Sequence, residues 1–212
     1  MPEILFSDNS IVVCIKPAKV SSQEDGTENS MPALLRAAEN CDFIAAVHRL
    51  DKDVSGVMVY AKTRQAAAEL SRQASEGEMK KEYLAVIRGV PEADSGVYED
   101  LLFHDSSKNK SYTVKRMRRG VRKASLEYEV LNKNEAASLS LVKILLHTGR
   151  THQIRVQFSS RGTPLMGDRK YGGGGECGIA LFARSLGFNH PVTGEEMVFS
   201  AETPDTYPWD LF

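Results

Sequence analysis

The sequence lacks a framework of cysteines. Its three cysteines, Cys14, Cys41 and Cys177, lie far apart, without a Cys-x-x-Cys pair and without a neighbouring histidine at the spacing of zinc ligands. They are expected to be small buried residues in a reducing compartment. An excess of charge is lacking as well, because 27 basic side chains stand beside 28 acidic ones and give a formal net charge of -1. Any nucleic-acid site must therefore be a local patch.

Long apolar runs are also absent. Residues 1–6 do not form a basic stretch followed by an apolar one, and no window approaches the roughly 20 apolar residues of a membrane span. We therefore expect a soluble, cytoplasmic protein that does not enter a membrane. No internal repeat, low-complexity segment or Pro/Ser-rich linker divides the chain, which predicts a single domain over residues 1–212.

The apolar pattern predicts an α+β fold with a mixed, largely antiparallel sheet flanked by helices. Two short apolar runs separated by a Ser-Asp-Asn-Ser tetrad indicate a β-hairpin near the N-terminus. The strands are expected at residues 4–6, 11–15, 44–47, 56–61, 83–87, 97–102, 125–131 and 139–146.

Three helices are expected from their end signals. Ser30 precedes a helix that carries Pro32 in its first turn and buries Leu34, Leu35 and Ala38. A second helix begins after Thr63 and stops at Gly77. A third is bounded by Thr151 as N-cap and Gly162 as terminator, and the glycines at 172–175 are expected to form a flexible surface loop.

Three segments gather residues that could carry chemistry. The loop at residues 48–56 combines a histidine, two basic residues and two carboxylates between apolar strands, where catalytic groups tend to lie, although a solvated charged turn has the same composition. Residues 146–155 follow a strand and enter a helix, and His152, Arg155 and Ser159 would share one helix face suited to an anion or a carboxylate. Residues 80–89 place Tyr83 at the start of an apolar strand.

Taken together and in this order, these segments resemble the RluA family of pseudouridine synthases. The central signature His-Arg-Leu-Asp-x-x-Thr-Ser-Gly is matched by residues 48–56, with Val54 in place of the threonine. The element Lys-x-Tyr-x-Ala-x-x-x-Gly is matched at 81–89 and Gly-Arg-x-His-Gln-Ile-Arg at 149–155. Gly-x-Pro-x-x-Gly-Asp-x-x-Tyr-Gly follows at 162–172, whereas Gln157 replaces a histidine of the family. The resemblance spans nearly the whole chain from Lys16-Pro17 onward and is closest to short members without an N-terminal S4-type domain.

The resemblance implies an isomerase that breaks the C1'–N1 bond of uridine and rejoins the base through C5, without a cofactor or metal. Asp51 would be the catalytic carboxylate, kept ionised by Arg155. Tyr83 would stack on the base and assist proton removal from C5. Ile154 would pack against the base, and Arg49 would occupy the space left by the flipped nucleotide. His48, Lys81 and Arg150 complete the substrate contacts expected near the site.

A basic stretch supplies the expected phosphate contacts. No acidic residue occurs from 108 to 123, and Tyr112 is interleaved among the cations and could stack on a base. A solvated hairpin has the same pattern, but beside the family signature we expect it to bind a stem-loop of ribosomal or transfer RNA. The cations are Lys108, Lys110, Lys115, Arg116, Arg118, Arg119, Arg122 and Lys123. We expect the protein to act as a monomer, without an obligatory protein partner.

Three other functions fit parts of the sequence. Asp51 and Asp53 could form the carboxylate pair of a nucleoside or glycoside hydrolase. A metal hydrolase could use His48, Asp51, His147 and His152, although their spacing matches no zinc motif. A non-catalytic RNA-binding module would keep the basic stretch alone.

Overall fold

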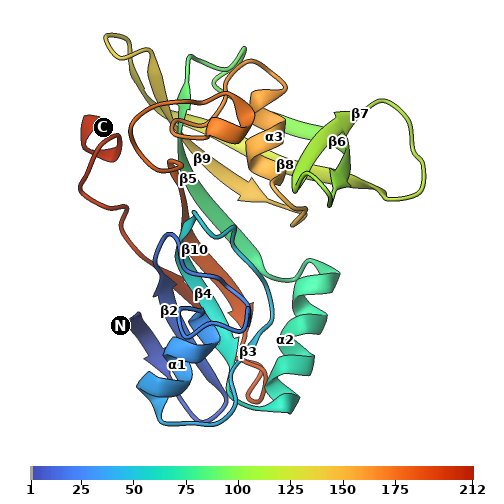
Figure 1. The fold of residues 1–212 in the computed structure, drawn as a ribbon, viewed down its shortest axis with the longest axis vertical. Coiled ribbons are helices and arrows are strands. Elements are labelled where there is room, and N and C mark those ends of the chain that lie inside the picture. Colours follow the sequence, from blue (N-terminus) through green and yellow to red (C-terminus); the bar gives the residue numbers. More distant parts are fainter. Residues whose placement is uncertain (1) are drawn as a thin grey trace. The chain divides into compact units, whose positions relative to one another are not determined.

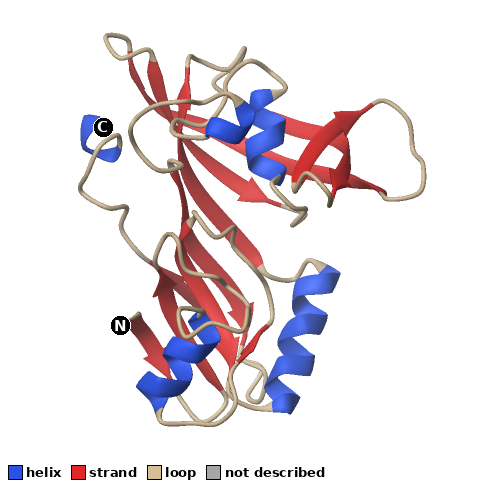
Figure 2. Cartoon of the chain, viewed as in Figure 1, coloured by secondary structure: helices blue, strands red, loops and turns tan. Residues whose placement is uncertain are grey.

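The protein has the predicted α+β architecture. The computed structural model describes residues 2–212, and within them it contains eleven strands, three α-helices and two short 3-10 helices (Figures 1 and 2). The chain divides into two compact units, Met1–Lys81 with Ala183–Glu202 and Glu82–Phe182 with Thr203–Phe212. Each unit is described below by itself. The single domain expected over residues 1–212 stays a prediction.

The first unit is built on an antiparallel sheet. The strands β1 (Glu3–Ser7) and β2 (Ile11–Lys16) form the predicted N-terminal hairpin, and β2 pairs with β4 (Ser55–Ala61). The two-residue β3 (Ala45–Ala46) pairs with β4, and β11 (Glu196–Ser200) pairs with β10 (Leu181–Asn189), most of which lies in this unit. Consecutive residues of β2 and β4 are buried, so both faces of these strands are covered.

Local end signals fix the two helices of this unit. In α1 (Met31–Glu39) the Ser30 hydroxyl accepts a hydrogen bond from the Ala33 N–H, and the helix ends at Asn40 in the left-handed conformation. In α2 (Arg64–Glu76) Thr63 caps the start and Gly77, with φ of 78°, ends the helix. Leu35 is buried as expected, whereas Leu34 is only half-buried and Ala38, in the last turn of the helix, is exposed.

The second unit contains a five-stranded antiparallel sheet in the order β5-β9-β8-β6-β7. Its strands are β5 (Lys80–Arg88), β6 (Ser95–Asp105), β7 (Lys110–Val114), β8 (Val121–Asn134) and β9 (Leu139–Leu146). The helix α3 (Gln153–Ser159) buries Phe158 completely, and Val156 packs with Leu102 and Ala124 from the sheet. The 3-10 helices are η1 (Arg169–Tyr171) and η2 (Trp209–Leu211).

Two expectations for this unit were wrong in detail. Thr151 does not cap α3, because His152 is the N-cap in a left-handed conformation, with φ of 55° and no side-chain cap. The glycine run is not a loose surface loop. Gly173 is buried and its N–H donates to the Asp168 carbonyl at 2.8 Å, and a Cβ there would lie 1.7 Å from the Leu165 carbonyl oxygen.

Candidate active site

The loop that carries Asp51 connects β3 to β4 and is held on both sides of the aspartate. Leu50 is buried, and the Ser22 hydroxyl accepts from its N–H at 3.1 Å and donates to its carbonyl at 2.7 Å. Val54 is also buried, and its N–H donates to the Asp51 carbonyl at 3.0 Å. Asp51 itself is half-buried. Its carboxylate is therefore accessible on a loop that is fixed on both sides by the hydrogen bonds and burial of Leu50 and Val54.

The loop ends at a position, Gly56, that only glycine can occupy. Its φ is +131°, and a Cβ at this position would lie 2.4 Å from the Ala183 carbonyl oxygen on β10. Only glycine allows this close approach of two backbones. Val54, which stands where the family has threonine, is 2 % exposed and places an apolar side chain in the packed base of the loop.

A buried lysine, Lys16, fixes the loop through a hydrogen bond to the Lys52 carbonyl. In the sequence this residue stands out only as part of the Lys16-Pro17 pair. Lys16 is fully buried, and its Nζ donates to the carbonyls of Pro17 and Val20 at 2.8 Å and of Lys52 at 3.0 Å. Burial lowers the pKa of Lys16 to about 8, and the nearby carboxylates of Asp53 and Asp51 act in the opposite direction. The ammonium form has three N–H donors, one for each carbonyl. The one feature of the sequence that could have indicated its burial is the position of Lys16 directly after the apolar run at residues 11–15.

His48 and Lys81 also lie in the first unit, and both are half-buried. The His48 Nε2 accepts a hydrogen bond from the Val59 N–H at 3.2 Å, so this nitrogen carries no proton. Burial, aided by the positive charge of Lys81, lowers the pKa of His48 to about 3, and burial lowers the pKa of Lys81. His48 is therefore a neutral residue that anchors β4, and its expected contact with RNA stays a prediction. Arg49 is exposed.

The remaining candidates near the signature lie in the second unit. Tyr83 is a buried residue of β5, opposite Ile144 of β9, and Ile154 and Arg155 are buried in the first turn of α3. Arg150 is exposed just before the helix, where its Nε donates to the Lys123 carbonyl at 3.0 Å. The pairing of Arg155 with Asp51 was expected from the resemblance and stays a prediction.

Arg155 is bound by a carboxylate within its own unit. Its Nε donates to Asp168 Oδ2 at 2.6 Å and its Nη2 to Oδ1 at 2.9 Å, which is a bidentate ion pair with 6 % and 1 % of the two side chains exposed. Asp168 Oδ1 also accepts from the Tyr171 N–H at 3.3 Å and caps η1. Sequence reasoning placed Asp168 in a family motif but gave it no role. Its spacing from Arg155 alone could not reveal the pair, because the contact depends on the chain turning back at Gly167.

A second buried network joins the start of α3 to β7. The Tyr171 hydroxyl lies 3.0 Å from His152 Nδ1 and accepts from the Ser111 N–H at 2.7 Å, and the Ser111 hydroxyl donates to the Thr151 carbonyl at 2.6 Å. The Arg155 guanidinium carbon lies 5.1 Å from the centre of the Tyr171 ring. Burial raises the pKa of Tyr171, which stays a neutral hydroxyl. Tyr171 thus contacts all three residues of the expected helix face, since its carbonyl also accepts from the Ser159 hydroxyl.

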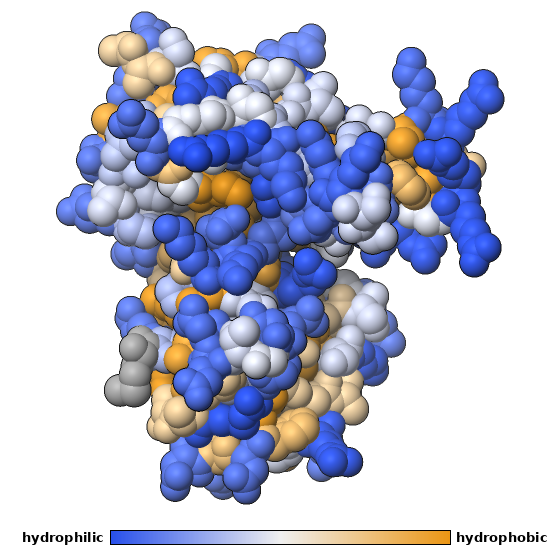
Figure 3. Space-filling model, viewed as in Figure 1, coloured by the Kyte–Doolittle hydropathy of each residue, from blue (hydrophilic) through white to orange (hydrophobic). Residues whose placement is uncertain are grey.

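The basic stretch spans β7, the connection from β7 to β8 and the start of β8; it is not a hairpin, because β7 and β8 each pair with β6, which lies between them. Five of the cations expected to contact RNA are exposed between β7 and the start of β8, and Figure 3 shows hydrophilic side chains over the region that Figure 1 labels β7. These residues are Lys115, Arg116, Arg118, Arg119 and Arg122. Arg118 is partly fixed, since its guanidinium carbon lies 5.0 Å from the centre of the Phe103 ring.

Within the described residues, no group of three or more His, Cys, Asp and Glu side chains could hold a metal ion. All three histidines considered as ligands of a metal hydrolase have other partners: His48 accepts from the Val59 N–H, His147 lies 3.0 Å from Glu127, and His152 contacts Tyr171. In the same part of the chain, residues 2–212, no helix is long and apolar enough to cross a membrane.

The comparisons with known proteins define the class. The family model described as RNA pseudouridylate synthase matches residues 10–160. An uncharacterized RNA pseudouridine synthase of Aquifex aeolicus is 36% identical over 96% of this chain and 70% of its own length, and ribosomal large subunit pseudouridine synthase D of Pseudomonas aeruginosa is 32% identical over 99% and 70%. The solved structure of human RNA pseudouridylate synthase domain containing 1 shares the fold, with a TM-score of 0.79 over 97% of this chain and 85% of its own, at 23% identity. The chain belongs to the RNA pseudouridylate synthase family, as its resemblance to the RluA members predicts.

Proposed function

We propose that the protein isomerises specific uridines of structured ribosomal or transfer RNA to pseudouridine, in the cytoplasm, as a monomer without a cofactor. The observation that carries this proposal is the presentation of Asp51. Its loop is fixed by Leu50, Val54 and the buried Lys16 ammonium, within a chain that belongs to the family. A carboxylate held in this way can act at the anomeric carbon or on the base without first paying the entropy of ordering a loop.

The reaction proceeds inside a single nucleotide. The C1'–N1 bond breaks, the base rotates, and a C1'–C5 bond forms, after which C5 loses a proton and N1 gains one, so that substrate and product are isomers. Asp51 adds to the base or the ribose, or removes a ribose proton, and Arg155 supplies the opposite charge that favours the ionised carboxylate. Tyr83 stacks on the base, and its hydroxyl assists departure of the C5 proton.

The uridine must first leave the stack of the RNA. Flipping costs a few kcal/mol, and phosphate contacts to the exposed cations between β7 and the start of β8 offset this cost. Arg49, exposed beside Asp51, fills the position of the flipped nucleotide, while Ile154 packs against the base.

The test is an Asp51→Asn variant with Asp53→Asn as its matched control. Both remove one carboxylate charge from the same loop without changing volume, and Asp53 is exposed. Asp51→Asn should abolish pseudouridine formation in unmodified ribosomal and transfer RNA transcripts while keeping RNA affinity and the unfolding midpoint. Asp53→Asn should stay active. Turnover near wild type in Asp51→Asn would refute the assignment, and release of free uracil with dependence on both aspartates would favour the hydrolase.

A further inference from the structure

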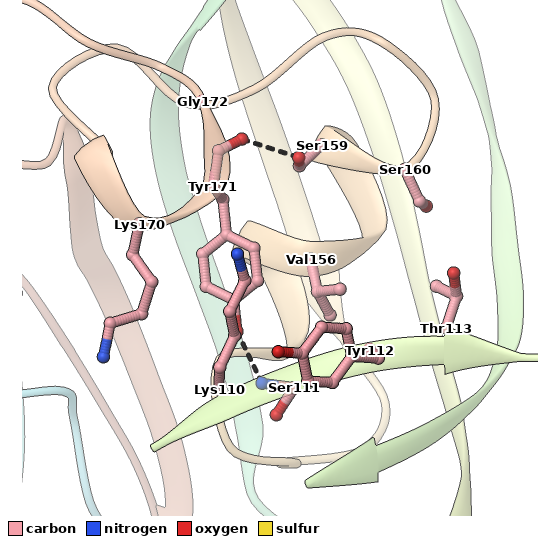
Figure 4. A pocket seen from close by; sticks show the side chains of 10 residues that line it. All are labelled: Lys110, Ser111, Tyr112, Thr113, Val156, Ser159, Ser160, Lys170, Tyr171 and Gly172. Carbon is pink, nitrogen blue, oxygen red and sulfur yellow. Dashed lines mark hydrogen bonds between the residues drawn. The ribbon is translucent and has the colours of Figure 1, made fainter. Parts of the chain in front are cut away.

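The second unit contains a pocket that the proposed reaction does not use. It is an open depression with a volume of about 310 Å³, lined by residues of β7, α3 and η1 (Figure 4). Lys110, Ser111 and Tyr112 come from β7, Ser159 from α3, and Lys170 and Tyr171 from η1. This volume lies at the lower end of the roughly 300–1,000 Å³ typical of small-molecule sites. Neither Asp51 nor Tyr83 lines the pocket, so it is not the place of the reacting uridine.

Positive charge is the first property of this pocket. Its lining includes two lysines and no acidic residue. Lys170 is exposed, and its Nζ donates to the Asn109 carbonyl at 2.9 Å, which leaves two ammonium hydrogens for another acceptor. Within residues 2–212, neither lysine is in ion-pair distance of a carboxylate, so the pocket attracts an anion.

Aromatic surface is the second property. The Lys110 Nζ lies 5.2 Å from the centre of the Tyr171 ring and 5.8 Å from that of Tyr112, and Figure 4 shows the three side chains together. Tyr112 is 37 % exposed, so its ring can receive a planar group, whereas Tyr171 is buried and forms the wall. A ligand that combines an anion with a flat π-system satisfies both properties.

The wall of the pocket contacts one of the proposed catalytic residues, Arg155. Tyr171 contributes its ring to the pocket, while its hydroxyl contacts His152 and its ring packs near the Arg155 guanidinium. The Ser159 hydroxyl donates to the Tyr171 carbonyl at 2.7 Å and holds this residue from the side of α3. An occupant of the pocket therefore lies one side chain away from Arg155.

We propose that this pocket is a subsite for a second, unpaired nucleotide of the substrate RNA, distinct from the target uridine. Its base stacks on Tyr112, and its phosphate lies between Lys110 and Lys170. The inference rests on the proposed function only in taking RNA as the substrate. It adds a recognition element outside the reaction centre, one that selects RNAs with a second extruded base.

The test uses a short single-stranded oligouridylate that carries 5-iodouridine, together with binding titrations of the full chain. Irradiation should crosslink the RNA to Tyr112 in the wild-type protein. Tyr112→Ala should weaken binding about 5- to 150-fold, the range for loss of one stacked base, whereas Tyr112→Phe keeps the ring and should bind nearly as wild type. Lys170→Gln should also weaken binding, and the Tyr112→Ala/Lys170→Gln double variant should lose less than the product of the single effects, because both side chains hold one nucleotide.

Lys115→Gln is the matched control, an exposed lysine directly after β7 and outside the pocket lining. The loss of RNA affinity in the Lys115→Gln/Tyr112→Ala double variant should equal the product of the two single losses. Crosslinks only outside the pocket, or purely multiplicative losses for Tyr112 and Lys170, would overturn the subsite. None of these readouts requires turnover. A wild-type protein that shows the crosslink but makes no pseudouridine would refute the proposed reaction and leave the subsite standing.

Discussion

The ion pair of Arg155 and Asp168 gives the sharpest prediction. Asp168→Asn keeps the volume of the side chain but removes its charge. The amide oxygen can still accept one guanidinium N–H, while the amide NH2 faces a second N–H and cannot accept from it. Since 6 % of the Arg155 side chain and 1 % of the Asp168 side chain are exposed, water cannot replace the lost acceptor. Arg155 is left as a buried cation with its bidentate partner gone.

The cost follows from this burial. Breaking a buried ion pair by removing one partner destabilises a protein by about 3–5 kcal/mol. For a chain of this size each kcal/mol lowers the midpoint of thermal unfolding by about 2–4 °C, so the midpoint should fall by roughly 6–20 °C. Turnover measured well below that midpoint should fall as well, because the guanidinium is no longer fixed in orientation.

Denaturant titration and single-turnover tritium release from C5-labelled RNA provide the assay. The matched control is Asp94→Asn, which breaks the exposed ion pair of Asp94 with Lys133 and should cost about 1 kcal/mol or less. Equal costs for the two variants would show that the buried pair does not hold Arg155. A destabilised Asp168→Asn protein that turns over at the wild-type rate would show that the orientation of Arg155 is not needed.

Three further predictions test other parts of the molecule. The folded-state pKa of Lys16, about 8, lies below its ordinary value of 10.5. Between these pH values the unfolded chain holds a proton that the folded chain lacks, so folding stability rises with pH. Lys16→Met should remove roughly 3 kcal/mol of this rise in denaturant titrations at several pH values, and an unchanged pH profile would contradict the buried ammonium. Replacing Arg118, Arg119 and Arg122 together by Gln should weaken RNA binding across sequences and flatten its salt dependence, and an unaltered salt slope would show that this basic stretch is a solvated surface without phosphate contacts. Tyr83→Phe should keep RNA affinity but lower tritium release by roughly 10²- to 10⁴-fold, while Tyr83→Ala lowers both, and wild-type release in Tyr83→Phe would limit the tyrosine to stacking.

Elements set by local chemistry were predictable from the sequence. Ser30, Thr63 and Gly77 mark helix ends because a hydroxyl can accept a free N–H and glycine tolerates a left-handed conformation. The strands β7, β10 and β11 were not predicted. In β7 the alternation of buried and exposed residues is short and lies among charged residues, so the sequence pattern does not reveal a strand. The strand β10 pairs with β11 and closely approaches Gly56, and no local sequence pattern shows these contacts.

The candidate site also has a part that the sequence predicts and a part that it does not. The positions of Asp51, Tyr83 and Arg155 in the chain follow from motifs, and their catalytic roles stay predictions. Lys16 and Asp168 were quoted as motif letters without a role. Their importance comes from what they contact across 36 and 13 residues of chain, Lys52 and Arg155. Such contacts depend on tertiary packing, which a single sequence does not reveal.

Stability alone does not explain these buried charges. An apolar pair of similar volume in place of Arg155 and Asp168 would often be neutral or stabilising, because two charges need not then be desolvated. The same reasoning applies to Lys16, whose burial lowers its pKa and therefore costs free energy while the ammonium is charged. In each unit a buried charge instead fixes part of the expected site: Lys16 holds the Lys52 carbonyl in the loop of Asp51, and Asp168 holds the Nε and Nη2 groups of Arg155. Electrostatic groups that are oriented before substrate arrives need no reorganisation during the reaction. We therefore attribute the two buried charges to preorganisation of the site, obtained at some expense of folding stability.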